Sequence, residues 1–435
     1  MIKGIVLFLL VNVMACMGDT SKKASSDNKV TLPRSLVNTS HLDYLCTPVT
    51  FADGTETAGV YIYAEAPDYH LTAAPGEGYT CVDDVSRAAL VYLRSNKFFT
   101  DTSTRSKVFK LINFLLEMQS SNGYFYNFLL SGNQVNTNGR TSINHPEWWS
   151  WRALQTLTEG SPLVKATNEQ LSEKMDQAVN KLVAALKGNM VNLPQTTKMV
   201  AGLTIPQWLP AGSGTDQAAL LILGLIPYCI NRNDAVMTNY IKKLADGIAL
   251  MQHGDSTQYP YGAILSWENS WHAYGSDQAY ALLRAGTFLH DPRYTSKGLH
   301  EIDNFYPWLL QTGLKSSFFV ANDGGVIQQT SEKAFEQIAY GIRPMVFAAI
   351  EAYRLTGQQK YADIAGHLSA WFLGANVQDR HMYSFTTGRC YDAISSPSKL
   401  NANSGAESTI EALLTMQRVE SYPAVKVALE KYIKE

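Results

Sequence analysis

The chain has 435 residues, 46% of them hydrophobic, with 36 Lys and Arg residues against 38 Asp and Glu residues and a formal net charge of −2. A chain of this size and composition can form one large or two ordinary globular cores. Its balanced charge lacks the basic surface that nucleic-acid binding requires, so we expect no nucleic-acid partner.

The first 15 residues have the composition of a lipoprotein signal peptide. A positive charge at Lys3 precedes a short apolar run over residues 5–13, which is too short to span a membrane. The run ends in "VMAC", which resembles a lipobox, so we expect lipidation at Cys16. Residues 16–30 would then be a flexible tether, and the protein would be exported and held at the periplasmic or cell surface by its lipid anchor alone. The alternative is an ordinary signal peptide with an incidental cysteine.

Four further cysteines follow, and they could pair in three ways. Their spacing matches no zinc motif, and the nine histidines show no metal-ligand spacing, so we expect neither a metal nor a cofactor. They are Cys46, Cys81, Cys229 and Cys390.

From residue 76 onward one pattern recurs: an acidic residue opens a long helix rich in Ala, Leu and Gln. The first instance is "DDVSRAALVYL" and the fourth is "GSDQAYALLRAG". The repeats lie about 65 residues apart, a spacing that indicates an internal structural repeat. The six acids are Asp84, Glu147, Asp216, Asp277, Glu336 and Glu407.

A second helix follows in each unit and ends about 35 residues after the acid. The clearest ends are Gln119, Gln252, Gln311 and Trp371. These second helices are amphipathic, as in "SKVFKLINFLLEM", whereas the first helices are apolar on all sides.

Six such helix pairs can bury both helix types by closing into a ring. Six parallel apolar helices would form the inner layer and six amphipathic helices the outer layer, which is an all-α (α/α)6 toroid. We expect residues 31–435 to be a single toroid domain with an irregular N-terminal strap over about residues 31–70. An open solenoid is the alternative for a repeat of this length.

In a closed ring all six inner helices begin at the same mouth, so their acids converge. The alternative is that each acid merely caps its own helix. The 23 Tyr and 8 Trp residues exceed the needs of such a core, and most of the tryptophans lie near these helix starts. A mouth that combines carboxylates and indoles is suited to binding sugars. The tryptophans concerned are Trp148, Trp149, Trp151, Trp208, Trp267 and Trp271.

Three stretches carry a family resemblance: "GYTCVDDVSRAAL", "WFLGANVQDRHMYSFTTGRCYDAI" and "NANSGAESTIEALLTM". They resemble motifs of six-hairpin glycosidase-like proteins, notably the toroid domain associated with bacterial glycosyltransferases. The likeness covers about residues 76–417 and implies the toroid fold and a carbohydrate role. This chain departs from the pattern at Ser86, Arg389 and Ala393 and has no glycosyltransferase domain. The resemblance places Asp83, Asp84, Arg87, Asp392 and Glu407 at the family's polar positions.

Ring geometry sets opposite units against each other and so suggests the acid–base pairs. We favour Asp84 with Asp277, because the aromatic stretch "WENSWHAYGS" precedes Asp277. Asp216 with Glu407 is the second choice for a catalytic pair, and Glu147 with Glu336 the third. The expected substrate-binding residues are Asp83, Arg87, Tyr79, Glu147, Trp149, Trp271, Tyr274, Glu336 and Asp392.

The function that we predict is an exported, lipid-anchored glycoside hydrolase that cleaves an oligosaccharide or polysaccharide with two carboxylates. One alternative is a polysaccharide lyase or uronyl hydrolase, in which Arg87, Arg343 and Arg389 would hold the uronate. The other is a non-catalytic glycan-binding lipoprotein.

Overall fold

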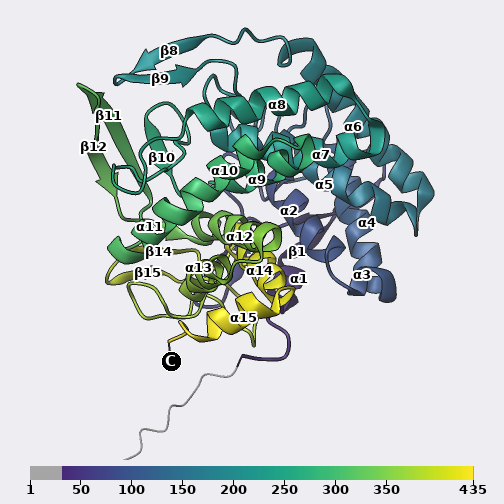
Figure 1. The fold of residues 1–435 in the computed structure, drawn as a ribbon. Coiled ribbons are helices and arrows are strands. Elements are labelled where there is room, and N and C mark those ends of the chain that lie inside the picture. Colours follow the sequence, from purple (N-terminus) through teal and green to yellow (C-terminus); the bar gives the residue numbers. More distant parts are fainter. Residues whose placement is uncertain (1–31, 435) are drawn as a thin grey trace, which may run out of the picture.

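The computed structural model describes residues 32–434, and its core is a ring of six inner helices (Figure 1). Each inner helix packs against the next, and the last packs against the first, so the ring is closed. The open solenoid is thereby excluded. The inner helices are α2 (Val82–Leu93), α5 (Trp148–Lys165), α7 (Thr215–Arg232), α9 (Gln278–Leu289), α12 (Ala339–Thr356) and α14 (Ala406–Glu420).

An outer layer covers the ring, and each outer helix packs against the inner helix that precedes it in the chain. The outer helices are α4 (Thr102–Glu117), α6 (Glu169–Asn189), α8 (Ala235–Leu250), α10 (Pro292–His300), α13 (Gln359–Ser369) and α15 (Pro423–Glu430). Helix α10 continues through the π-helical turn η1 (Glu301–Phe305) into α11 (Tyr306–Thr312). The short elements α3 (Lys97–Thr100) and η2 (Ala370–Phe372) complete this layer.

The two layers differ in burial as their sequences predict. Every residue of α2 except Asp83 is buried, whereas α4 buries one stripe that includes Val108, Leu111 and Leu115. A helix that is apolar on all sides is stable only when neighbours surround it. The predicted (α/α)6 arrangement is therefore the observed one.

The segment expected as an irregular strap contains regular elements. It holds α1 (Ser40–Leu45) and two antiparallel hairpins: β1 (Cys46–Thr50) with β2 (Glu56–Val60), and β3 (Tyr63–Glu65) with β4 (His70–Thr72). Ahead of them, Leu36 N donates a 3.0 Å hydrogen bond to Glu420 of α14. The start of the described chain is thus fastened to its last inner helix.

Small antiparallel sheets lie around the mouth of the ring, where the inner helices begin. Strands β5 (Thr80–Cys81) and β13 (Gln337–Ile338) lead directly into α2 and α12. The β8–β9 and β11–β12 hairpins project from the ring at one side (Figure 1). The remaining strands of these sheets are β6 (Phe128–Leu130), β7 (Gln134–Val135), β8 (Thr197–Val200), β9 (Leu203–Pro206), β10 (Ser270–His272), β11 (Ser317–Asp323), β12 (Val326–Lys333), β14 (Ala393–Ser396) and β15 (Lys399–Asn401).

The predicted leader, the tether over residues 16–30 and Cys16 lie outside the described residues. Within residues 32–434, Cys46, Cys81, Cys229 and Cys390 are all free thiols. No helix in that range is both long enough and apolar enough to cross a bilayer.

Candidate active site

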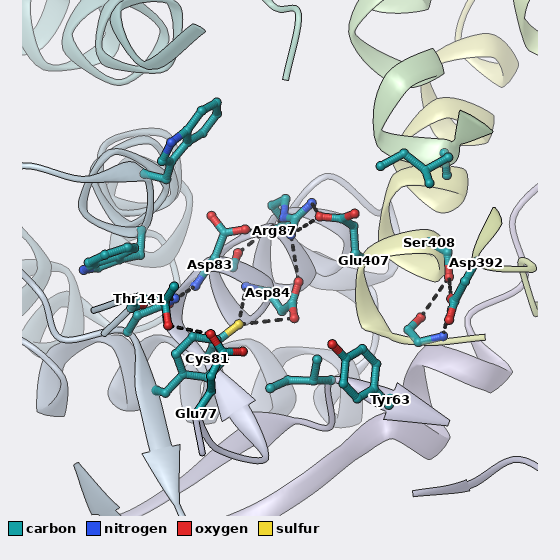
Figure 2. Close-up of a pocket in the computed structure, with 18 of the residues that line it drawn as sticks. Tyr63, Glu77, Cys81, Asp83, Asp84, Arg87, Thr141, Asp392, Glu407 and Ser408 are labelled. Atoms are coloured by element: carbon teal, nitrogen blue, oxygen red, sulfur yellow. Dashed lines mark hydrogen bonds and ion pairs between the residues drawn. The ribbon is translucent and has the colours of Figure 1, made fainter. Parts of the chain in front are cut away.

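A cavity of about 550 Å³ opens at the mouth where α2, α5, α12 and α14 begin. Its walls are rich in carboxylates, and Arg87 is the one basic side chain among the described residues that line it. The tryptophans Trp148 and Trp149 also line it. Figure 2 shows Asp83, Asp84 and Glu407 around Arg87. The lining acids are Glu77, Asp83, Asp84, Glu336, Asp392 and Glu407.

Arg87 joins four carboxylates at the floor of this cavity. Its Nη2 lies 2.7 Å from Asp83 Oδ2, 2.8 Å from Asp84 Oδ1 and 3.4 Å from Glu407 Oε2. Its Nη1 lies 2.7 Å from Glu411 Oε1. A guanidinium that is buried among four acids in this way holds the carboxylates in fixed positions and has little capacity left for an anionic ligand.

Glu407 has an unusual protonation equilibrium. Burial of its carboxyl group raises the pKa to about 7, the Arg87 charge opposes this rise, and the charges of Asp84, Glu411 and Asp83 add to it. Its side chain nevertheless keeps 43% of its surface exposed, on the side that faces the cavity. A carboxyl group with a pKa of about 7 is protonated in about half of the molecules at neutral pH, and this one is accessible to a ligand.

Asp83 and Asp84 differ in exposure although they are adjacent. The Asp83 side chain is 22% exposed, whereas the Asp84 side chain is 6% exposed. Asp83 lies beside a second arginine, with Oδ1 3.4 Å from Arg152 Nε, and this oxygen accepts no hydrogen bond. Burial raises the pKa of Asp84, with the Arg87 charge opposing the rise.

Cys81 fixes Asp84 from below. The Asp84 backbone N–H donates to Cys81 Sγ at 3.4 Å, and the thiol donates to Asp84 Oδ2 at 3.2 Å. Burial, together with the charges of Asp84 and Asp83, raises the thiol pKa well above its usual value. Cys81 is therefore a neutral thiol, and its role is to cap α2. We assign it no nucleophilic role, because the reactive form of a cysteine is the thiolate.

Asp392 and Glu77 also line the cavity, Asp392 beside Ser408 and Glu77 beside Thr141 on the other side (Figure 2). Asp392 Oδ1 accepts hydrogen bonds from Ser408 Oγ at 2.6 Å and from Gly405 N at 2.8 Å (Figure 2). Burial raises the Asp392 pKa. Thr141 Oγ1 donates to Glu77 Oε1 at 2.5 Å. Each of these carboxylates has an oxygen to which a ligand hydroxyl could donate.

Tyr63 and Glu77 line the cavity but were not predicted from the sequence. Tyr63 begins β3 in the N-terminal segment, and burial raises its pKa, with further contributions from the charges of Glu77 and Asp392. The sequence held one indirect signal, because Glu77 directly precedes the quoted "GYTC" motif. Tyr79, the predicted platform in that stretch, does not line the cavity and instead donates to Asn133 Oδ1 at 2.6 Å.

Asp277 does not line the cavity, so it does not face Asp84 across the mouth. It is fully buried and forms a two-pronged ion pair with Arg343, with distances of 2.6 Å and 3.1 Å. Trp271 is likewise buried, stacked on Phe318 with the edge of Phe305 beside it. The expectation that Trp271 is an open sugar platform is thus wrong, because β11 and η1 cover it.

Three predicted residues form a separate polar group beside the cavity. Asp216 Oδ2 lies 3.1 Å from His272 Nε2, and Tyr274 stacks on that imidazole ring. Gln217 Nε2 donates to Glu147 Oε2 at 3.3 Å, and burial raises the Glu147 pKa. The structure therefore brings Glu147, Asp216 and Tyr274 together, while Glu336, exposed at the cavity wall, accepts a hydrogen bond from Ser395.

Capping does not account for these acids. Glu147 and Asp277 occupy N-cap positions of α5 and α9, yet neither side chain makes a capping hydrogen bond. Asp216 lies inside the first turn of α7, where it accepts a hydrogen bond from Gln217 N at 2.6 Å, and the N-cap there is Gly214. Among residues 32–434 no group of three His, Cys, Asp or Glu side chains is placed to hold a metal ion.

No family model matches the chain, and no curated protein matches it by sequence. Solved structures do resemble it. A sugar epimerase from a ruminal bacterium superposes with a TM-score of 0.58 at 12% identity, covering 83% of this chain and 92% of that one. The cellobiose 2-epimerase from Bacillus thermoamylovorans B4167 gives 0.57 at 10% identity, covering 84% and 92%. A D-mannose isomerase gives 0.56 at 12% identity, covering 84% and 92%.

The chain has the (α/α)6 toroid fold. Identities of 10% to 12% establish this shared architecture and nothing more, because one fold supports many chemistries. The chemistry of this toroid therefore depends on the residues of its own cavity.

Proposed function

We propose that the protein is a carbohydrate-active enzyme and, more specifically, a glycoside hydrolase. The observation that carries this proposal is the cavity itself, which combines two lining tryptophans with six carboxylates, one of them with a pKa raised to about 7. Indole faces stack on sugar rings, and carboxylates accept hydrogen bonds from hydroxyl groups. Glycosidic cleavage further requires one protonated and one ionised carboxyl group.

Glu407 is the general acid in this proposal, because burial raises its pKa to about 7 and its carboxyl group faces the cavity. Its proton passes to the glycosidic oxygen as the bond to the anomeric carbon breaks. Asp83 is the second carboxylate, since its side chain is 22% exposed and its Oδ2 lies 2.7 Å from Arg87 Nη2, whereas its Oδ1 is buried beside Arg152. In the retaining reaction that a pair at about 5 Å performs, an Asp83 oxygen bonds to the anomeric carbon as the leaving oxygen takes the Glu407 proton, and a water deprotonated by Glu407 then displaces Asp83.

Asp84 is a positioning residue rather than a catalytic one. Its side chain is nearly all buried, both of its oxygens have partners within the protein, and its charge helps to keep Glu407 protonated. Asp83 and Glu407 contact the same nitrogen, Arg87 Nη2, at 2.7 Å and 3.4 Å. The two oxygens are therefore at most about 6 Å apart, which is nearer to the separation of about 5 Å in retaining pairs than to the 6.5 to 9.5 Å at which inverting pairs admit a water.

The charge of the cavity favours a neutral sugar over a uronic acid. Arg87 is committed to four carboxylates, and Arg343 to Asp277 and Glu411. Arg389 lies in a different pocket. An anionic substrate would be repelled by six carboxylates, and among the described lining residues no arginine or lysine is free to pair with it. The cavity therefore gives no support to the lyase or uronyl hydrolase alternative.

The test is reducing-sugar release from a panel of neutral oligosaccharides and polysaccharides by the full chain. We expect Glu407→Gln to lose about a thousandfold in kcat, the scale for a general acid that also carries charge. The matched control is Glu430→Gln, an exposed residue of α15 outside the cavity, which should keep full activity. Cleavage that survives in a folded Glu407→Gln variant would refute the assignment.

The same reactions, followed by NMR, separate the other functions. A sugar could instead be converted to its epimer or keto isomer with its glycosidic bond intact. The protein would then be an epimerase or isomerase, as the similar solved structures are named, and not a hydrolase. Glycan binding with no turnover would make the protein a glycan-binding lipoprotein.

We also propose that the protein is exported and anchored through a lipid on Cys16, on the basis of the charged, apolar and "VMAC" segments of residues 1–16. Cells that incorporate a labelled fatty acid should label the wild-type chain and not Cys16→Ser. Equal labelling of both would refute the anchor.

A further inference from the structure

A second pocket, of about 450 Å³, lies in the loop region between η2 and β14. Its polar walls come from the turn around Ser384, Thr386 and Thr387 and from Tyr391, with Tyr69 and Arg389 facing each other. No acidic side chain from the described part of the chain lines it. The next residue, Asp392, lines the mouth cavity instead, and the two pockets share no lining residue.

Arg389 has an unusual environment in this pocket. Its guanidinium lies 3.9 Å from the centre of the Tyr69 ring, which positions the cation flat against the aromatic face. Its Nε is buried and has no hydrogen-bond partner. Among residues 32–434 no carboxylate forms an ion pair with it.

The other arginines show how exceptional this is. The buried ones, Arg87, Arg152 and Arg343, all have carboxylate partners. Half-buried Arg105 donates to the Phe99 carbonyl, and Arg380 is exposed to water. A partly desolvated guanidinium with no counter-charge is costly, and an unsatisfied group of this kind calls for a missing partner.

The backbone holds Arg389 in place before any ligand arrives. Its N–H donates to Thr387 Oγ1 at 3.3 Å, and its carbonyl accepts from Ser384 N at 2.9 Å. The preceding Gly388 has φ +75°, and a Cβ there would lie 2.3 Å from the Asn38 carbonyl oxygen, so the turn is fastened to the N-terminal segment. A cation that is already held in position loses little conformational entropy when a ligand binds, and this favours binding.

We propose that this pocket is an anion site that binds the phosphate or sulfate group of a small molecule. The guanidinium supplies charge and several N–H donors, and the Ser384, Thr386 and Tyr391 hydroxyls supply further donors to the oxygens of the ligand. The site stands apart from the proposed hydrolase chemistry, since it shares no lining residue with the mouth cavity.

Calorimetric titration of the full chain tests this site. Inorganic phosphate, inorganic sulfate, a hexose phosphate and the free hexose are each titrated at constant ionic strength. Phosphate and sulfate should bind, and the hexose should not. If the hexose phosphate binds more tightly than free phosphate, the ligand of the site is a phosphorylated sugar. If the two bind equally, the ligand is the free anion.

Arg389→Gln should weaken phosphate binding by about tenfold or more, the loss expected for charge-assisted hydrogen bonds. Arg380→Gln is the matched control, since Arg380 lies in the same loop and is exposed, and it should bind as the wild type does. If Arg389→Gln does not fold, Arg389→Lys retains the charge without the fork of donors and should still bind more weakly. The proposal fails if the wild type binds no oxyanion, or if the Arg389 variants bind as tightly as it does.

Discussion

Asp83 and Asp84 are neighbours on one helix, yet their surroundings assign them different tasks. Asp84 points into the floor, where Cys81 and Arg87 occupy its oxygens, while Asp83 keeps one oxygen without a hydrogen bond. A buried, fully bonded carboxylate acts mainly as a fixed charge. At the scale of a single residue, that fixed charge adds to the effect of burial in raising the pKa of Glu407.

The first prediction concerns the pH dependence of cleavage. Because burial raises the Glu407 pKa to about 7 and the acid works only when protonated, kcat/KM should fall as the pH rises through about 7. Asp84→Asn removes a negative charge that raises this pKa, so the alkaline limb should move to lower pH. A limb that stays in place in Asp84→Asn would show that a different group titrates.

The second prediction concerns Asp277, which the sequence favoured as a catalytic residue. Asp277→Asn breaks a buried ion pair and leaves Arg343 with less compensation, so it should lower the free energy of unfolding by about 3 to 5 kcal/mol. Urea unfolding measures this loss. Asp379→Asn, which breaks the exposed pair with Lys434, should cost less than about 1 kcal/mol. A stable but inactive Asp277→Asn variant would restore a catalytic role.

At the scale of the helices, a glutamine at the end of an outer helix joins neighbouring units. Gln119 Nε2 donates to Gly123 O at 2.9 Å and to Ala178 O of α6 at 2.8 Å. Gln252 Nε2 repeats this with Gly262 O and Lys297 O of α10, both at 2.9 Å. The repeated glutamine of the sequence therefore corresponds to a repeated contact.

The third prediction follows from that contact. Gln252→Ala removes the side-chain donor of Gly262 O and one of the two donors of Lys297 O, which keeps the Glu301 N–H, so we expect a loss of about 2 kcal/mol in the free energy of unfolding. Gln311→Ala is the natural control, because Gln311 occupies the equivalent helix end but is exposed, and its change should stay within about 0.5 kcal/mol. Equal losses in both variants would mean that the contact contributes nothing specific.

These elements also show how far the sequence could predict the molecule. The spacing of acids and glutamines located both helix layers, because burial imposes a period on each helix. It could not reveal that Arg343, one turn into α12, neutralises Asp277, or that β11 covers Trp271, since such contacts join distant segments. Tyr63 escaped prediction because its three-residue strand carries too short a pattern.

At the scale of the whole molecule, one buried carboxylate helps to close the ring. Glu411 of α14 lies 2.7 Å from Arg87 of α2 and 2.6 Å from Arg343 of α12. Gln417 Nε2 adds a 2.8 Å hydrogen bond from α14 to Val91 O of α2. The helices at the two ends of the chain are thus joined by charge as well as by packing, so the toroid should unfold as one unit rather than repeat by repeat.

The fourth prediction tests this closure through pH. Burial opposes ionisation of Glu411, but the charges of Arg343 and Arg87 outweigh it and lower the pKa from 4.5 to about 2. Because the folded pKa is the lower one, the stabilisation is present above about pH 4.5 and is lost as the pH falls towards 2. Glu411→Gln should therefore cost about 3 to 5 kcal/mol at neutral pH, and the difference from the wild type should shrink across that acidic range.

Urea unfolding of both proteins at a series of pH values, followed by circular dichroism and tryptophan fluorescence, measures this difference. Both signals should change together in the wild type, because a closed ring cannot lose one helix pair without opening its seam. Glu430→Gln, at an exposed position of α15, should follow the wild-type curve at every pH. Curves for Glu411→Gln and the wild type that stay parallel down to acidic pH would show that Glu411 does not stabilise the seam by its charge. The closure between α14 and α2 would then rest on apolar packing and the Gln417–Val91 hydrogen bond.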